Sequence, residues 1–226
     1  MARPRAADHD LKRRAILDRS AKLFADRGYA RTSMSEIALA CGSSKALLYH
    51  YYENKEQLLH ALLKAHFVKL EEAIQAADVP AAPPVERLRA LIAALLAAYE
   101  GADALHKVQI NELTSLPLQR QQELKSYERR LVELFAGVLH DINPALAEGT
   151  GLLKPVTMSV FGMINWSYLW FRPDGAMSRA AYANLVTQIT VDGISSLGTV
   201  PLPVALGHPQ EKAVVRRPRA TGRGPG

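Results

Sequence analysis

Residues 32–58 constrain the fold of this chain more than any other stretch, because they carry the start and stop signals of successive short helices. Ser33 and Glu36 form a Ser-x-x-Glu capping box, which predicts the start of a helix. Cys41-Gly42 predicts a tight turn, and Ser44 directly after it is a good cap for the next helix. Two short helices joined in this way are typical of a helix that lies in the major groove of DNA.

The rest of the chain shows apolar residues at helical spacing, with no strand pattern and no repeat. We expect a first helix over about 10–27, ended by Gly28 as a C-terminal cap, and a long helix from Asn54 to about 77. Five further helices are expected at 85–100, 103–113, 118–140, 151–171 and 178–197. The predicted fold is therefore all-α, with a three-helix head, a helical body and about nine helices.

Domain boundaries follow from these patterns. The first residues are basic and have no apolar stretch behind them, so we expect a basic disordered arm at 1–9. The helix-turn-helix head is expected at 10–54 and the helical body at 55–198. Residues 199–226 are rich in Pro, Gly and Arg, which predicts a disordered basic tail.

Composition excludes several classes of protein. A chain of 226 residues with 48% apolar residues is long enough and apolar enough for a real core. A single cysteine excludes an internal disulfide framework and a multi-thiolate metal site. We expect no metal, no cofactor, no membrane span and a cytoplasmic location. The net charge of +6 lies mostly on the N-terminal segment and the tail, which indicates either a polyanionic partner or a solvated surface.

Residues 10–60 resemble the DNA-binding head of the TetR family of bacterial transcriptional regulators. The resemblance rests on Thr32, Ile37-Ala38, Cys41-Gly42, Ser44, Leu48-Tyr49, Tyr51-Tyr52, Lys55 and Leu58. Cys41, Ser43 and Ala46 depart from the residues common in the family, which bears on sequence preference more than on fold. The resemblance implies that 55–198 is a ligand-binding and dimerisation domain, and that the chain binds palindromic double-stranded DNA as a homodimer.

The second short helix begins with the residues best suited to reading bases. Ser44, Lys45 and Ala46 open it, and a lysine there favours guanine O6 and N7. One recognition helix gives little specificity, whereas two that lie roughly 34–36 Å apart read a palindrome.

The remaining DNA contacts are expected at phosphates. Thr32 and Ser33 offer hydroxyl or backbone N–H donors at a helix start. Tyr49 and His50 lie one turn beyond Lys45, and Lys55 adds a point charge to a helix N-terminus. Alternatively, Tyr49 packs and His50 is a solvated surface residue. For Tyr51 and Tyr52 we expect packing.

Residues 158–175 hold both tryptophans of the chain, at i and i+4 on one helix face, beside an asparagine that needs hydrogen-bond partners. The segment looks like one found in TetR-type regulators that respond to acyl-coenzyme A thioesters. That resemblance implies a small-molecule effector in an elongated apolar pocket; alternatively, this is an ordinary core helix. The candidate effector-binding residues are Tyr99, His106, Gln109, Phe135, Phe161, Met163, Asn165, Trp166, Trp170 and Arg172.

The last helix carries an apolar stripe that is a candidate dimer interface, formed by Tyr182, Leu185, Val186, Ile189 and Ile194. The family resemblance implies a four-helix interface across a two-fold axis. Alternatively, a monomer buries this stripe internally.

The leading hypothesis is a ligand-responsive repressor that an effector releases from a palindromic operator. A second hypothesis is an architectural protein that binds DNA without sequence preference. An enzyme is disfavoured, because the common nucleophile, phosphate-loop and zinc-protease motifs are missing from the sequence.

Overall fold

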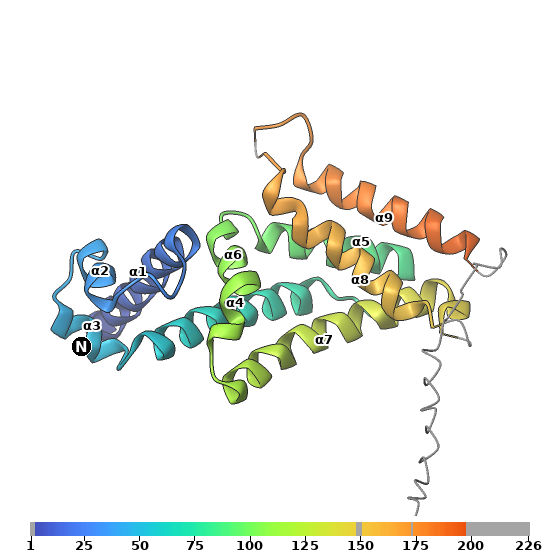
Figure 1. Cartoon of the computed structure of the whole chain (residues 1–226). Coiled ribbons are helices and arrows are strands. Elements are labelled where there is room, and N and C mark those ends of the chain that lie inside the picture. The colour runs from blue at the N-terminus through green and yellow to red at the C-terminus, as the bar shows by residue number, and fades with distance from the viewer. Residues whose placement is uncertain (1–2, 148–150, 173, 198–226) are drawn as a thin grey trace, which may run out of the picture.

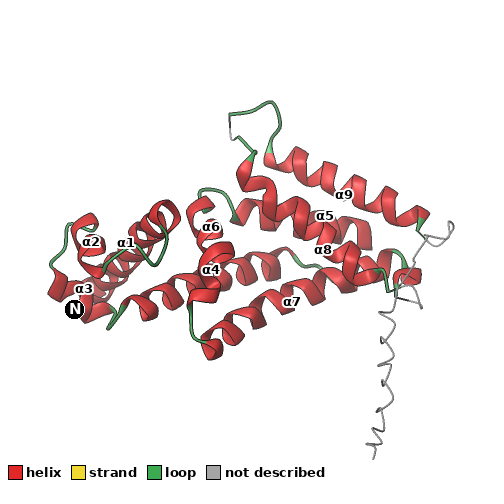
Figure 2. Ribbon diagram, viewed as in Figure 1, coloured by secondary structure: helices red, strands yellow, loops and turns green. Residues whose placement is uncertain are grey.

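The computed structural model describes residues 3–147, 151–172 and 174–197, with side chains described from residue 9 onward (Figure 1). Within these ranges the chain forms nine α-helices and three short 3₁₀ helices, and no strand (Figure 2). The predicted all-α fold is confirmed. The tail predicted to be disordered, 199–226, lies outside the described residues.

The head consists of α1 (Arg3–Arg27), α2 (Met34–Ala40) and α3 (Lys45–Tyr51). The Ser33 hydroxyl oxygen accepts from the Glu36 N–H at 3.2 Å, and the Glu36 carboxylate accepts from the Ser33 N–H at 2.8 Å. The predicted capping box therefore starts α2. The Ser44 hydroxyl caps α3 by accepting from the Leu47 N–H at 3.1 Å.

The first helix begins at Arg3, so the prediction of a disordered arm at 1–9 is wrong for residues 3–9. Pro4 lies in the first turn, where its missing N–H costs no helical hydrogen bond. Ala6 and Ala7 then favour helix, and adding residues to an existing helix is far easier than starting a new one.

The body consists of six α-helices, α4 (Lys55–Ala77), α5 (Pro84–Ala98), α6 (Asp103–Glu112), α7 (Leu118–Ile142), α8 (Leu153–Asn165) and α9 (Arg179–Ser196). Short 3₁₀ helices η1 (Leu113–Ser115), η2 (Pro144–Leu146) and η3 (Trp166–Leu169) follow α6, α7 and α8. In Figure 1 the head lies at one end of α4, and α4 runs from it into the body beside α7. Because the head packs on the start of α4, a shift of α4 moves the head.

One apolar core runs through head and body. Leu58 and Leu62 of α4 are 0% and 1% exposed, and Phe135 of α7 is 0% exposed. The Glu123 carboxylate fastens α7 to α4, because it accepts from Lys64 Nζ at 2.7 Å and lies 2.9 Å from His60 Nε2. Such surface pairs add little stability, but they fix how the two helices lie against each other.

Helix α8 ends at Asn165, six residues before the predicted end of this helix. The chain continues as the 3₁₀ helix η3, and the Asn165 carbonyl oxygen lies 3.0 Å from His106 Nε2. A side chain from another helix thus takes up a carbonyl at the helix terminus, which allows the helix to stop there. Trp166 and Trp170 are therefore not on one α-helical face, and that prediction is wrong.

None of the helices in the described part of the chain has the length and apolar character needed to cross a membrane.

Gly28 ends α1 with a φ of +83°, and its N–H donates to the Phe24 carbonyl at 2.9 Å. Gly28→Ala places a side chain in the left-handed region, so we expect a loss of ~1–2 kcal/mol in the free energy of unfolding, measured in urea. Gly137→Ala, in the exposed interior of α7 with no atom within 4 Å of the added Cβ, is the control and should stabilise by up to ~1 kcal/mol. Equal effects would contradict this assignment.

Candidate nucleic-acid interface and effector site

Helix α3 presents most of its surface to solvent. Leu48 is 0% exposed and anchors the helix to the head, whereas Tyr49 is 42% exposed. Ser44, Lys45, Ala46 and His50 are exposed as well. The structure thus brings the residues expected to read bases together with Tyr49 and His50 on one exposed helix. Tyr52 packs as expected, because it is 3% exposed and its hydroxyl accepts from Arg13 Nε at 3.4 Å.

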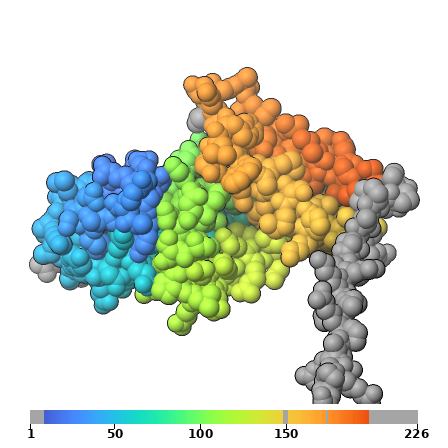
Figure 3. Space-filling view, viewed as in Figure 1, coloured from blue at the N-terminus to red at the C-terminus, as the bar shows by residue number. Residues whose placement is uncertain are grey.

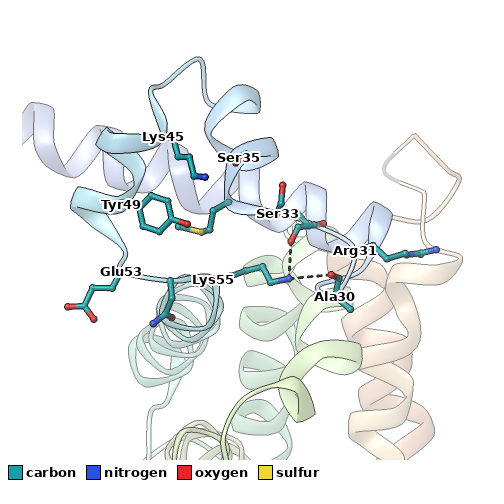
Figure 4. A pocket seen from close by; sticks show the side chains of 11 residues that line it. Ala30, Arg31, Ser33, Ser35, Lys45, Tyr49, Glu53 and Lys55 are labelled. Carbon is teal, nitrogen blue, oxygen red and sulfur yellow. Dashed lines mark hydrogen bonds between the residues drawn. The ribbon is translucent and has the colours of Figure 1, made fainter.

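An open groove of about 470 Å³ lies between α3 and the starts of α2 and α4 (Figure 4). Lys45 and Tyr49 line it from α3, and Ser33 and Ser35 line it from the start of α2. The Lys45 ammonium lies 5.8 Å from the centre of the Tyr49 ring. A cation and hydroxyl groups along one groove suit a phosphate backbone.

Thr32 does not present its hydroxyl to this surface. Its side chain is 1% exposed, and its hydroxyl donates to the Gly28 carbonyl at 2.9 Å. Its N–H donates to the Tyr29 carbonyl at 3.2 Å. Both donors expected to meet a phosphate are thus used inside the head, which corrects the prediction for this residue. The Ser33 hydroxyl and N–H both donate to the Glu36 carboxylate at 2.8 Å, so Ser33 serves the capping box.

Lys55 binds the turn at 28–32. Its ammonium donates to the Tyr29 and Thr32 carbonyls at 2.8 and 2.9 Å and to the Ala30 carbonyl at 3.4 Å, and lies 4.3 Å from the centre of the Tyr29 ring. Figure 4 shows Lys55 reaching this turn from the start of α4. The sequence predicted a point charge for phosphate, and the structure adds the role of holding the turn that precedes α2.

The same turn is held from the body. The Tyr29 N–H donates to Glu112 Oε1 at 3.0 Å, and Glu112 Oε2 accepts from the Ser115 hydroxyl at 3.1 Å. Figure 3 shows the head and α6 in contact along a seam, where Arg31 and Lys107 line a groove of about 280 Å³. Glu112 is thus the last residue of α6 and a hydrogen-bond acceptor for the head.

Four of the predicted effector residues meet in a polar cluster that also includes His66 of α4. The Tyr99 hydroxyl donates to Asn165 Oδ1 at 2.8 Å, and the His106 and Tyr99 ring centres lie 4.4 Å apart. Gln109 Nε2 donates to Glu128 Oε1 at 3.2 Å. Both His66 nitrogens, His106 Nδ1 and Gln109 Oε1 are buried without a hydrogen-bond partner among the described protein atoms.

Burial makes the two histidines of this cluster neutral. Burial lowers the pKa of His66 to about 4, with smaller contributions from His106 and Lys69 and an opposing one from the Gln109 side chain. Burial also lowers the pKa of His106, against the opposing hydrogen bond to Asn165. Burial also raises the pKa of Glu128. Buried polar groups without partners are costly, so such clusters are common at ligand sites.

Of the other six predicted effector residues, three lie inside the body and three lie at its surface. Phe135 and Phe161 are buried, with ring centres 4.9 Å apart, and form an apolar wall. Met163 is half-buried and its carbonyl accepts from the Tyr182 hydroxyl at 2.8 Å. The remaining three lie at the surface, where Trp166 and Trp170 are each 53% exposed and Arg172 is exposed.

The predicted dimer stripe on α9 is divided between two faces. Tyr182, Val186 and Ile194 are 7%, 0% and 2% exposed and pack inside this chain, where α9 lies against α5. That part of the prediction is wrong, because residues four apart share the face toward α5. Leu185 and Ile189 are 41% and 51% exposed on the other face.

Several residues that contribute to these sites were missed by the sequence analysis, among them His66, Glu112 and Glu128. His66 follows the apolar spacing of α4 between Leu62 and Leu70, which was a usable signal for a buried position. Glu112 gave no signal, because its partner Tyr29 is distant in sequence. Among the described residues no group of three or more His, Cys, Asp or Glu side chains is placed to hold a metal.

Two family profiles match the chain. Residues 16–62 match "Bacterial regulatory proteins, tetR family", and residues 81–194 match "Tetracyclin repressor-like, C-terminal domain". Among curated relatives, the transcriptional regulator BetI of Rhizobium meliloti (strain 1021) is 39% identical over 89 residues, which cover 39% of this chain and 44% of BetI. The transcriptional repressor KstR2 of Mycolicibacterium smegmatis is 26% identical over 81% of this chain and 91% of its own length.

Solved structures agree with these matches. A TetR-family transcriptional regulator from Bordetella parapertussis 12822 is 34% identical over 82% of this chain and 96% of that chain, with a TM-score of 0.76. AibR, in a complex with isovaleryl coenzyme A and operator DNA, is 32% identical over 79% of this chain and 97% of that chain, with a TM-score of 0.66.

The role of Lys55 in the turn predicts a stability effect. Lys55→Met keeps the apolar stem but removes the ammonium from carbonyls 2.8 and 2.9 Å away, so unfolding in urea should become easier by about 2 kcal/mol. Lys45→Met, on the exposed face of α3, is the control and should stay within about 0.5 kcal/mol of the wild type. If the two variants are equally stable, Lys55 does not hold the turn.

Because His66 is buried and neutral, we predict that acid lowers the free energy of unfolding. Its pKa is about 4 in the folded chain against an ordinary 6.5, so protons prefer the unfolded chain as pH falls below 6.5. Between pH 7.5 and pH 5 this group should therefore remove about 2 kcal/mol of stability. His66→Leu should remove that share of the pH dependence, measured by urea unfolding at both pH values. Identical pH dependence in the two proteins would contradict the neutral, buried state of His66.

Proposed function

The chain belongs to the TetR family of bacterial transcriptional regulators, and from that premise we propose that it is a cytoplasmic, homodimeric repressor released from a palindromic operator by an acyl-coenzyme A-type effector. The observation that carries this proposal is the exposed face of α3. Ser44 and Lys45 at its start read bases, while Tyr49, His50 and the groove beside them follow the phosphate backbone.

Dimer formation is supported by apolar side chains that the single chain leaves exposed on α8 and α9. Met158 is 50% exposed, and Leu185 and Ile189 are 41% and 51% exposed. Gly162 and Gly193 have no atom within 4 Å of an added Cβ, so a second copy can approach closely there. Pairing these faces joins two heads in one particle, as reading a palindrome requires.

The effector site is proposed where the aromatic wall meets the polar cluster. Phe135 and Phe161 offer apolar surface, and Asn165, one turn after Phe161 on α8, joins Tyr99 and His106 as hydrogen-bonding groups. The relative AibR, whose structure contains isovaleryl coenzyme A, supports a thioester of a short apolar acid. Arg172 is exposed near this end of the body and can meet the phosphates of coenzyme A.

Effector binding reaches the head through two helices. His66 of α4 and His106 of α6 lie in the polar cluster, while Lys55 of α4 and Glu112 of α6 hold the turn before α2. A ligand that separates α4 from α6 therefore changes how the two heads are held. An effector that binds one spacing of α4 and α6 more tightly than the other couples to DNA binding by ~1–3 kcal/mol, which changes the affinity for DNA by about 5- to 150-fold.

Selection of bound duplexes from a random DNA library, followed by sequencing, tests the DNA-reading proposal. We expect a palindromic motif whose half-sites are one helical turn, about 10 base pairs, apart or a multiple of that. Lys45→Ala should change the preferred base at one position of each half-site, by ~1–3 kcal/mol if the lysine binds guanine. Recovery of duplexes without any common motif would contradict the repressor and favour an architectural DNA-binding protein.

The effector proposal is tested by fluorescence anisotropy on the selected operator. Saturating isovaleryl-coenzyme A should weaken DNA binding by about 5- to 150-fold, whereas coenzyme A alone should change it little, because it lacks the acyl group. Unchanged affinity with short- and long-chain thioesters alike would contradict this effector class and leave the DNA-binding proposal standing.

A further inference from the structure

The hydrogen-bond donors and acceptors of the polar cluster can be assigned atom by atom. His106 Nε2 lies 3.0 Å from the Asn165 carbonyl, which can only accept, so Nε2 carries the proton of the neutral ring. His106 Nδ1 is then an acceptor, and it is buried without a partner among the described protein atoms. His106 itself is 1% exposed. The cluster therefore holds a fixed, unsatisfied acceptor.

Gln109 adds a second acceptor. Its Nε2 donates to the Glu128 carboxylate at 3.2 Å, which orients the side-chain amide. Gln109 Oε1 is a buried acceptor that makes no hydrogen bond among the described protein atoms, although the Gln109 side chain faces the His66 ring closely enough to raise the pKa of His66 against the larger effect of burial. His66, 2% exposed, contributes one donor and one acceptor as a neutral ring. Acceptors thus outnumber donors among the buried groups without partners.

The charge of the cluster also limits what binds there. Its acidic member is Glu128, and the two histidines are neutral because burial lowers the pKa of each. The positive charge of Lys69 lowers the pKa of His66 slightly further, but the Lys69 side chain is exposed and lies outside the buried cluster. A carboxylate placed in the cluster would face acceptors and an acid without a buried cation, which is unfavourable.

We propose that the cluster formed by His66, His106 and Gln109 binds a neutral N–H or O–H donor of the effector and rejects a carboxylate. This inference rests on the proposed effector site. Two parts of an acyl-coenzyme A can supply such a donor: a hydroxyl on the acyl group, or an amide N–H of the pantetheine arm. Asn165 bonds to Tyr99, Tyr168 lies against His106, and both residues are half-buried, so we place the entry of the donor on their side of the cluster. His106 Nδ1 and Gln109 Oε1 are the groups that receive it.

Two substitutions of His106 distinguish the role of its Nε2 donor from that of its Nδ1 acceptor. In His106→Gln the longer amide reaches the Nε2 position and keeps the donor for Asn165, but the acceptor at Nδ1 is lost. In His106→Asn the shorter amide keeps an acceptor near Nδ1 and loses the bond to Asn165. Gln109→Leu removes the second acceptor and leaves His106 intact. Circular dichroism of each full-length variant confirms folding before binding is measured.

Calorimetric titrations with isovaleryl-coenzyme A, 3-hydroxyisovaleryl-coenzyme A and free isovalerate test the inference. If the acyl hydroxyl is the donor, the wild type should bind the hydroxylated thioester roughly tenfold more tightly, and His106→Gln should lose that preference. If a pantetheine amide is the donor, His106→Gln should weaken both thioesters roughly tenfold. In either case His106→Asn should stay closer to the wild type, Gln109→Leu should weaken binding, and isovalerate should not bind.

Three results would overturn the inference. Wild-type affinity for both thioesters in His106→Gln and in Gln109→Leu would show that the cluster does not contact the ligand, while the proposed function would stand. Binding of isovalerate as tight as that of the thioesters would show that the cluster accepts a carboxylate. Failure of the wild type to bind either thioester would overturn the proposed effector class and this inference together.

Discussion

The placement of the DNA-binding head depends on the turn at 28–32, which two helices of the body hold. Lys55, at the start of α4, donates to the Tyr29 and Thr32 carbonyls, and Glu112, at the end of α6, accepts from the Tyr29 N–H. A charged group takes part in each contact, and such hydrogen bonds are stronger than neutral ones. The start of α2, and with it the position of α3, follows from this turn.

The same two helices supply the polar cluster. Along α4, Lys55 and His66 are separated by about 16 Å, and along α6, His106 and Glu112 are separated by about 9 Å, at 1.5 Å per residue. Both helices are rigid over such distances. A ligand that changes the spacing of α4 and α6 at the cluster therefore also changes the position of Lys55 relative to Glu112 at the turn. In physical terms, such coupling requires only that the bound ligand prefers one spacing of α4 and α6 over another.

Local signals in the sequence predicted most of the fold, whereas contacts between distant residues set much of the site. The capping box at Ser33 and the caps at Gly28 and Asn54 could be predicted, because each depends on neighbouring residues. The link from Glu112 to Tyr29 could not be predicted, because only the packing of α6 on α1 brings them together. The two faces of α9 were confused for the same reason: both are apolar, and only the contact with α5 tells them apart.

We infer that the Glu112–Tyr29 hydrogen bond transmits part of the effect of a bound ligand from α6 to the head. The ratio of operator dissociation constants with and without isovaleryl-coenzyme A, measured in the wild type and in Glu112→Met, tests this inference. We expect Glu112→Met to bind the thioester as the wild type does and this ratio to fall well below the wild-type value, because only the contact through Lys55 of α4 then remains. The same ratio in both proteins, at equal occupancy by the thioester, would show that this hydrogen bond transmits nothing to the head.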